Sequence, residues 1–392
     1  MDGSGVSAVE PRTIAVVSVA RSDWGHLGPV LRELRAAPDV RLLLFVGGMH
    51  LSDAFGRSVE LIEAEGWPIA ERIEMLEPSD APEAIAASMG RGVAGFGRAY
   101  ARHRPDLVVV LGDRFEMLSA AAAALPFVLP VAHLHGGEVT EGAIDNQIRH
   151  AITKCAHLHF VSAEPHARRV AAMGEEPWRI HNVGAPGLDR IRTTPRLTRA
   201  ELARRLDLAP GDRWLIVTYH PATLEYQDTA RHTDELLAAL EKIDATFVVT
   251  YPNADTAGRA VIARLQEFAG RHPCVRLAQT LGDDVYLSLL GEADAMVGNS
   301  SSGLIEAPSF ELPVVNVGAR QAGRLRAGNV IDVGPERDEI LAGIEAVLAP
   351  GFREGLSGMT NPYGDGHAAE RIVRVLRAVE LGPTLTRKRE VA

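Results

Sequence analysis

Short apolar runs alternate along the chain with longer amphipathic or alanine-rich segments. Two sets of runs are expected to form strands. The first set is Thr13–Val19, Arg41–Val46, Leu107–Leu111, Val128–Leu134, His157–Val161 and Ile180–Val183, and the second is Trp214–Tyr219, Thr246–Tyr251, Val275–Ala278, Ala295–Val297, Val314–Val317 and Val330–Val333. Alternating strands and helices are typical of parallel sheets with helices on both faces. The pattern therefore predicts an α/β protein with two Rossmann-like domains that face a cleft.

The segment between the two sets of strands marks a domain boundary. Residues 187–212 are polar, rich in arginine and interrupted by Pro195 and Pro210, so the boundary is best placed near Arg190. We expect an N-terminal domain over residues 12–189 and a C-terminal domain over residues 190–366. The last helix, within residues 367–392, is expected to pack back on the N-terminal domain.

Composition narrows the classes of partner. The formal charge of −10, from 41 Lys and Arg against 51 Asp and Glu, argues against a nucleic-acid partner. No apolar run approaches the roughly 18 residues that span a membrane, and residues 1–11 lack an export signal. Cys155 and Cys274 have no metal or redox spacing, so reduced thiols and a cytoplasmic location are expected.

Two adjacent strands of the first set end in groups that can exchange protons. Asp113 follows Leu107–Leu111, and His135 and Glu138 follow Val128–Leu134, with Asp145 a few residues later. Ligands of open α/β sheets bind beyond the carboxyl ends of the strands. These residues therefore predict an acid–base site and an enzyme.

Other polar residues also follow predicted strands, and all of these positions are expected to converge on the cleft between the two domains. They are Arg21, His220, Asn253, the run Ser300, Ser301, Ser302 and Gly303 with Glu306 after it, and Arg320. Backbone amides and small hydroxyl groups at a helix N-terminus bind phosphate oxygens, which favours a nucleotide site at the serine run. The alternative is a helix cap without a ligand. Glu306 is expected one turn into the helix, where it could bind a ribose diol, and His220 could contact a phosphate or protonate a leaving group.

One glycine motif matches a dinucleotide-binding pattern but is not expected to bind a dinucleotide. Gly90, Gly92 and Gly95 match the GxGxxG pattern of dinucleotide-binding loops, but they lie inside a predicted helix over residues 81–104 with no strand before it. Glycines in such a place more often allow close packing.

Seven segments together resemble the hydrolysing nucleotide-sugar 2-epimerases, in particular the bacterial branch that supplies nonulosonic acid synthesis. They are GDRFE, HLHGGEVTEGAIDNQIRHAITK, NVGAPGLD, TYHPATLE, YPNADT, GNSSSGLIEAPSF and RQAGRLRAGNVIDV. The resemblance implies a glycosyltransferase-B architecture and release of UDP from a UDP-2-acetamido sugar. A base removes the C2 proton as UDP leaves, water adds to C1, and a proton returns to C2 on the other face. Neither a metal nor another cofactor is implied.

The resemblance also implies roles for individual residues. Asp113 and Asp145 match acidic catalytic positions and His220 a catalytic or phosphate-contacting histidine, while Ser301, Ser302 and Glu306 match the nucleotide loop and Arg21 a residue near the diphosphate. The animal-type branch has Glu where this chain has His135. We therefore expect Asp113 and Asp145 to transfer protons, with His135 and Glu138 available for the remaining role. His135 could instead orient Asp113, or form a metal pair with His133 on the same face of a strand.

Substrate and assembly are predicted less directly. The sequence of residues 139–154 favours UDP-N,N'-diacetylbacillosamine as the substrate, with UDP-N-acetylglucosamine as the alternative. UDP is favoured over GDP as the nucleotide. A glycosyltransferase with the same architecture and a non-catalytic nucleotide-sugar sensor are the other classes. The acidic groups beside the sugar favour the epimerase over both. The resemblance further suggests a homodimer or homotetramer.

Overall fold

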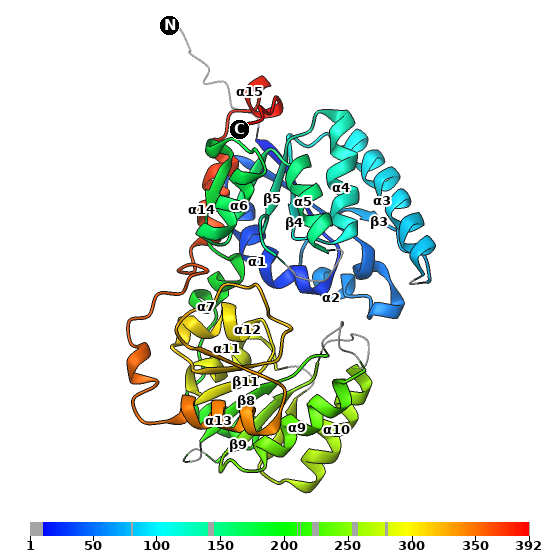
Figure 1. Ribbon diagram of the computed structural model, residues 1–392. Helices are drawn as coiled ribbons and strands as arrows, with labels where there is room; N and C mark the ends of the chain where they lie inside the picture. The colour runs from blue at the N-terminus through cyan, green and yellow to red at the C-terminus, as the bar shows by residue number, and fades with distance from the viewer. Residues whose placement is uncertain are drawn as a thin grey trace, which may run out of the picture. The chain divides into compact units, whose positions relative to one another are not determined.

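The chain divides into two compact units, each built on its own parallel sheet. The computed structural model describes residues 11–79, 81–139, 145–209, 211, 213–221, 227–252, 258–278 and 281–391. Unit 1 consists of Met1–Arg190 together with Tyr363–Ala392, and unit 2 of Ile191–Pro362. Helices flank both sheets (Figure 1). The predicted α/β class with two Rossmann-like sheets is confirmed.

Unit 1 contains a seven-stranded sheet in the order β3-β2-β1-β4-β5-β6-β7. The strands are β1 (Arg12–Ser18), β2 (Val40–Gly47), β3 (Ile69–Ile73), β4 (Leu107–Leu111), β5 (Val131–Leu134), β6 (Leu158–Val161) and β7 (Ile180–Asn182). The helices are α1 (Arg21–Ala36), α2 (Val59–Ala64), α3 (Pro82–His103), α4 (Phe115–Ala124), α5 (Asp145–Cys155), α6 (Glu164–Ala172), α14 (Ala368–Ala378) and α15 (Pro383–Thr386), and α7 (Asp189–Thr193) spans the unit boundary. The strand order reverses between β1 and β4, which is where Rossmann-like sheets bind ligands.

Unit 2 contains a six-stranded sheet in the order β10-β9-β8-β11-β12-β13. The strands are β8 (Trp214–Thr218), β9 (Thr246–Thr250), β10 (Val275–Ala278), β11 (Ala295–Gly298), β12 (Val314–Val317) and β13 (Val330–Val333). The helices are α8 (Arg199–Leu206), α9 (Thr229–Leu240), α10 (Gly258–Arg271), α11 (Asp283–Glu292), α12 (Ser302–Ile305) and α13 (Arg337–Leu348). Leu215 and Val217 belong to one core, whereas Trp214 and Ile216 belong to a second. Because helices cover both faces of β8, the residues from Trp214 to Val217 form a continuous apolar run.

Two strand predictions need correction. Strand β3 was not expected, because Ile73 is its one fully buried residue and the sequence IAERI lacks an apolar run. It lies at the sheet edge. The run from Val128 was expected to be extended throughout, but β5 begins only at Val131. Pro126 stands in a short 3-10 helix, and Val128 after it takes a left-handed conformation with φ 52°, which breaks the extended run.

The glycines of the GxGxxG pattern lie inside α3, where Gly92 and Gly95 allow close packing. A Cβ atom on Gly92 would lie 2.5 Å from Met75 Cε and 2.9 Å from Ser119 Cβ. Ser119 belongs to α4, the neighbour of α3. A side chain at position 92 would therefore push the two helices apart, which supports the packing interpretation over a dinucleotide site.

Helix α14 packs on unit 1 beside α1. Ile372, Val373 and Leu376 are buried in the core of that unit. Asp189 accepts hydrogen bonds from the backbone N–H groups of Ala368 and Ala369 at 3.0 and 2.8 Å, so its carboxylate caps the helix. The chain thus returns to its first unit after completing unit 2.

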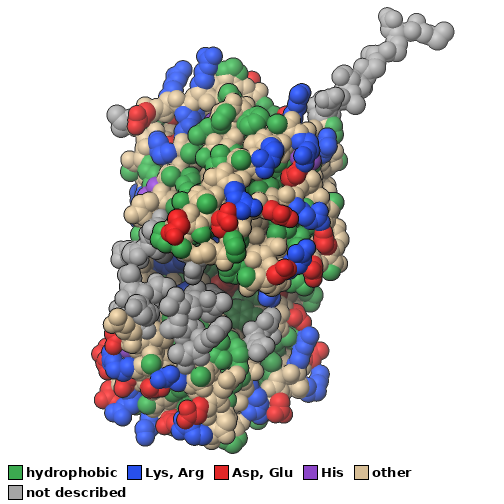
Figure 2. Space-filling model, turned by 90° about the vertical axis from the view of Figure 1, so that its right-hand side faces the viewer, with side chains coloured by type: hydrophobic (Ala, Val, Ile, Leu, Met, Phe, Trp, Pro, Cys, Tyr) green, Lys and Arg blue, Asp and Glu red, His purple; other side chains and the backbone are tan. Residues whose placement is uncertain are grey.

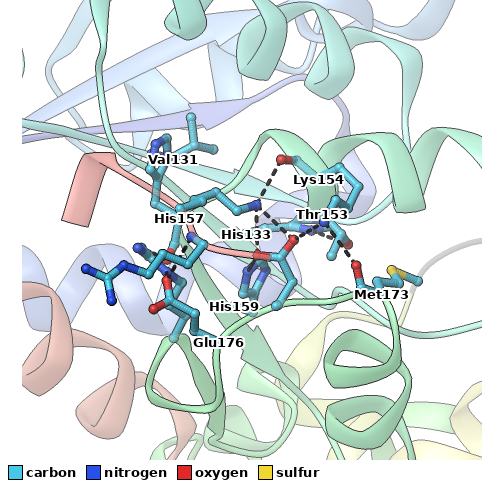
Figure 3. Close-up of polar contacts among 12 residues, drawn as sticks. Val131, His133, Thr153, Lys154, His157, His159, Met173 and Glu176 are labelled. Carbon is cyan, nitrogen blue, oxygen red and sulfur yellow. Dashed lines mark hydrogen bonds and ion pairs between the residues drawn. The ribbon is translucent and has the colours of Figure 1, made fainter. Parts of the chain in front are cut away.

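The C-terminal segment is attached to unit 1 by a buried charge cluster. Figure 3 shows Lys154 and His159 pointing toward one carboxylate, which belongs to Glu175. Its oxygens accept from Lys154 Nζ at 2.8 Å, from His159 Nε2 at 3.0 Å and from Lys388 Nζ at 2.8 Å. Burial raises the pKa of Glu175, but these three hydrogen bonds outweigh burial and lower it to about 2. Lys388 thereby joins the end of the chain to β6 and α5.

Glu175→Gln is expected to lower the free energy of unfolding by about 3 kcal/mol, because two ammonium groups would lose their buried counter-charge. Urea unfolding at neutral pH measures this change. The control is Glu164→Gln on α6, whose exposed pair with Arg168 at 3.6 Å should contribute less than about 0.5 kcal/mol. Equal effects of the two substitutions would contradict the assigned role of Glu175.

Candidate functional site

The carboxyl ends of β4 and β5 lie side by side in unit 1. The two strands pair in parallel with Leu111 opposite Leu134, and the Gly112 N–H donates to the Leu134 carbonyl at 2.9 Å. Asp113 follows the first strand and His135 follows the second. The sheet therefore brings these two predicted site residues to one edge.

Asp113 is paired with an arginine that was not among the predicted site residues. Arg149 lies on α5, is 4% exposed and donates from Nη2 to Asp113 Oδ2. Asp145 is the first residue of the same helix. Burial and then the negative charge of Asp113 raise the pKa of Asp145, and they outweigh Arg149 and Arg114. The pair thus offers one carboxylate held by a cation and one that keeps its proton more readily, a division suited to a base and an acid.

His135 is paired with Glu138. Its Nδ1 lies 2.7 Å from Glu138 Oε1. Burial raises the pKa of Glu138, but the charge and hydrogen bond of His135, followed by Arg149, hold it well below its ordinary value. Among the described residues, His135 Nε2 has no hydrogen-bond partner. The idea that His135 orients Asp113 is therefore wrong, because Asp113 is held by Arg149 and His135 by Glu138.

His133, two residues before His135, lies in β5 and has a structural role. It is fully buried, its Nε2 donates to the Gly112 carbonyl at 2.7 Å, and its Nδ1 lies 3.2 Å from Thr153 Oγ1. Burial lowers its pKa to about 3. Both nitrogens are engaged, and the part of the chain that the structure describes contains no group of three metal-ligating side chains. A metal pair with His135 is not supported.

In unit 2, His220 and Asn299 join two adjacent strand ends. β8 and β11 pair in parallel. The His220 N–H donates to Asn299 Oδ1 at 2.7 Å, and Asn299 Nδ2 donates to the His220 carbonyl at 2.8 Å. Burial, and then the charge of Arg320, lowers the pKa of His220 to about 4. His220 is thus neutral beside a guanidinium group, an arrangement that would favour an anion in contact with both.

The serine run forms a tight turn rather than the start of a long helix. Helix α12 is only Ser302–Ile305, and Glu306 is its C-cap, so the expectation that Glu306 lies inside the helix is wrong. The Tyr286 hydroxyl donates to Ser302 Oγ at 2.7 Å. Ser301 at the N-cap makes no side-chain capping bond, but Ser300 Oγ accepts a hydrogen bond from the Ser302 N–H at 3.3 Å, so capping accounts for one serine of the run. The turn carries Ser300, Ser301 and Gly303 at the end of β11.

The structure describes Arg21 and Arg320 among the other residues that were expected after strand ends. Arg21 is an exposed residue at the start of α1 in unit 1. Asn253 lies outside the described residues. Arg320, which follows β12, donates to the Asn299 carbonyl at 3.1 Å and so lies at the same edge as His220.

Sequence reasoning missed three polar residues near the acid–base groups: Arg149, Ser162 and His166. Arg149 follows Asp145 by four residues, so the two lie on one face of α5. This spacing could have placed Arg149 beside Asp145, but it does not encode the contact of Arg149 with Asp113. Ser162 follows β6 directly and obeys the same strand-end rule that found Asp113. Nothing in the sequence singles out His166.

The two parallel α/β sheets define a two-domain protein with a fold of the glycosyltransferase-B kind. The family model for UDP-N-acetylglucosamine 2-epimerase matches residues 32–377. UDP-N,N'-diacetylbacillosamine 2-epimerase (hydrolyzing) from Legionella pneumophila is 37% identical over 96% of this chain and 98% of its own. GDP/UDP-N,N'-diacetylbacillosamine 2-epimerase (hydrolyzing) from Campylobacter jejuni is 38% identical over 82% of this chain and 84% of its own.

A solved structure agrees in fold. UDP-GlcNAc 2-epimerase from Neisseria meningitidis, bound to UDP-GlcNAc, superposes with a TM-score of 0.79 and 16% identity over 94% of this chain and all of that one. The chain belongs to the UDP-N-acetylglucosamine 2-epimerase family and is an enzyme of the hydrolysing UDP-sugar 2-epimerase kind. Among the described residues, no helix combines the length and apolarity that a membrane crossing requires.

Proposed function

We propose that the enzyme converts UDP-N,N'-diacetylbacillosamine to UDP and 2,4-diacetamido-2,4,6-trideoxymannose, for the synthesis of legionaminic or sialic-type acids. The observation that carries this proposal is the 37% identity, over nearly the whole of both chains, to an enzyme named for that substrate. The Campylobacter jejuni relative is named for the same sugar. Release of UDP, rather than GDP, is favoured because both names include UDP.

In this reaction Asp113 and Asp145 exchange the C2 proton. Asp113, paired with Arg149, takes the proton from C2 while the bond from C1 to the diphosphate oxygen breaks, and UDP leaves with the electron pair. Asp145, whose pKa is raised by burial and by Asp113, returns a proton to C2 as water adds to C1. His135 and Glu138 supply the remaining acid–base role. The charges and contacts of these residues in unit 1 support the role assigned to each of them.

The diphosphate is assigned to unit 2. The turn of Ser300, Ser301, Ser302 and Gly303 offers backbone amides and hydroxyl groups, and His220 with Arg320 supplies donors beside it. A bound diphosphate would raise the pKa of His220, because the negative charge favours the imidazolium. His220 could then give its proton to the departing UDP. Glu306, Asn253 and Arg21 are assigned to the nucleotide by family resemblance.

A homodimer or homotetramer is also proposed. Three exposed apolar side chains, Leu125, Phe127 and Val128, follow α4, and Val93 on the adjacent α3 is 39% exposed. Figure 2 views the side of unit 1 that carries α3, where hydrophobic side chains lie among charged ones. Such side chains would gain from burial against a second copy. A cytoplasmic location fits the free thiols of Cys155 and Cys274.

Proton and phosphorus NMR in deuterated water tests the reaction, with UDP-N,N'-diacetylbacillosamine and UDP-N-acetylglucosamine in separate tubes. We expect UDP release with deuterium at C2 of a mannose-configured free sugar, faster in the first tube. Faster turnover in the second tube would reassign the substrate. Release of UDP without deuterium at C2 would overturn the epimerase assignment and with it the roles of Asp113 and Asp145.

A further inference from the structure

The hydrogen bonds around Glu138 determine which nitrogen of His135 carries its proton. Glu138 Oε1 lies 2.6 Å from Ser162 Oγ and 2.7 Å from His135 Nδ1. A carboxylate can only accept hydrogen bonds, so both neighbours donate to it. His135 therefore carries its proton on Nδ1, and in the neutral ring Nε2 presents a lone pair.

Ser162 and His166 extend this chain of hydrogen bonds from Glu138 toward α6. Ser162 has a single hydroxyl proton, which it gives to Glu138, so it accepts a hydrogen bond from His166 Nδ1 at 2.9 Å. Burial lowers the pKa of His166, against the opposing charge of Glu138. The hydrogen bond to Ser162 places the His166 proton on Nδ1. Ser162 is 1% exposed and His166 is 7% exposed, so bulk water does not compete for these bonds.

The backbone of the turn is pressed against the helix that carries His166. A Cβ atom on Gly137 would lie 2.4 Å from the His166 carbonyl oxygen, and Gly137 has φ 77°. Arg169 on α6 donates to the Gly137 carbonyl. His135 itself has φ 62°, a left-handed conformation that non-glycine residues adopt rarely and that is frequent in active sites. Helix α6 thus fixes where the His135 ring points.

His135 Nε2 is the last atom of this chain of hydrogen bonds. The residue is 9% exposed, and no described residue provides a hydrogen-bond partner for Nε2. The His26 ring lies edge-on at 5.0 Å, and the charged or titratable groups facing His135 are Glu138, Arg149, His133 and His166. A buried base atom without a partner among the described residues is suited to accept a proton from a bound water or substrate.

We propose that His135 Nε2 takes the proton of the water that adds to C1, and that Ser162 and His166 are positioning residues that hold Glu138 and His135 for this step. The inference rests on the proposed function, in which Asp113 and Asp145 act at C2. The electrons of the C1–C2 double bond form the new C2–H bond with the Asp145 proton, and the water oxygen bonds to C1. The surplus water proton moves to Nε2. Glu138 stabilises the resulting imidazolium of His135 until the imidazolium releases that proton to solvent.

Product partition in Ser162→Ala tests the positioning role. The variant should form free sugar about 10- to 100-fold more slowly, from the loss of a hydrogen bond to a charged group, while UDP release slows less. The unsaturated C1–C2 intermediate should therefore appear beside UDP in the NMR spectrum, with KM unchanged. Ser162→Thr, which keeps the hydroxyl, should restore the wild-type ratio. A wild-type rate and ratio in Ser162→Ala, or equal slowing of both products, would overturn the proposal.

A second measurement is independent of turnover. Nitrogen-15 NMR of labelled histidines, assigned by comparison with His135→Gln, should show His135 protonated at Nδ1 and unprotonated at Nε2 in the wild type at neutral pH. Glu138→Gln should shift the ring toward protonation at Nε2. An Nε2-protonated wild type would overturn the inference even if the enzyme epimerises. A wild type with the expected tautomer but no turnover would instead count against the proposed function.

Discussion

Asp113→Asn is expected to slow UDP release by about 10³-fold, because the amide cannot take the C2 proton and general base catalysis contributes about 10²- to 10⁴-fold. Asparagine keeps the size of the side chain, so the turn between β4 and α4 should persist. It also removes the carboxylate charge that Arg149 contacts, and we expect some loss of stability. Phosphorus NMR of UDP release gives the rate, and the melting temperature reports folding separately.

The matched control lies at the other end of the same strand. Asp106 precedes β4, is exposed, and accepts a hydrogen bond from the Thr13 N–H at 2.8 Å. Asp106→Asn should leave turnover within about twofold of the wild type, since surface substitutions rarely have larger effects. UDP affinity of Asp113→Asn, measured by calorimetry, should be unchanged, because the nucleotide is assigned to unit 2. A rate above one-tenth of the wild type would remove Asp113 from the proton transfer.

Most of the fold could be predicted from the sequence because of how the sheets are covered. Strands with helices on both faces are apolar throughout, as in β4 and β8, where all five residues are buried, and such runs are conspicuous. The edge strand β3 has no such signal, since most of its residues are half-exposed. The segment before β5 has the signal without the structure, because Pro126 and Pro130 interrupt it.

The position of the site residues was easier to predict than their pairing. Strand-end logic placed Asp113 and His135 at one sheet edge, which the structure bears out. The alternation rule would put His133 and His135 on one face, but His135 lies beyond β5 with φ 62°, so the rule no longer applies. The Arg149 guanidinium comes from a helix 36 residues away in sequence from Asp113. Its approach depends on the packing of α5, which no local pattern encodes.

The buried histidines have a consequence for the stability of unit 1 in acid. Burial lowers the pKa of His50 to about 4, of His133 to about 3 and of His157 to about 4. In the unfolded chain each would titrate near 6.5. The folded pKa is the lower one, so the stabilisation is complete above about pH 6.5 and is lost as the pH falls toward about 4.

Between neutral pH and about pH 5, unit 1 is therefore expected to lose about 2 kcal/mol per histidine, or about 6 kcal/mol for the three. Asp23, whose pKa is raised to about 6 by burial, takes up a proton in the same window and offsets about 1 kcal/mol of this loss. The remaining loss is comparable with the whole stability of a typical domain, about 5–15 kcal/mol. Among its described residues, unit 2 contains one such histidine, His220, with its pKa lowered to about 4, and should lose about 2 kcal/mol. Unit 1 should therefore open at a higher pH than unit 2.

Hydrogen exchange resolved by peptide fragment checks this order, since β5 reports unit 1 and β8 reports unit 2. Protection of β5 should fall between about pH 6 and 5 while that of β8 persists. His50→Gln should narrow the difference, because glutamine can keep contacts with Ser18 and Ser58, which lie 2.8 Å from the His50 nitrogens, and takes up no proton. Glu175, with its pKa near 2, contributes stability that is lost only below about pH 4.5, so it acts in a separate window. Equal protection of β5 at neutral pH and at about pH 5 would mean that these histidines are not held neutral by burial.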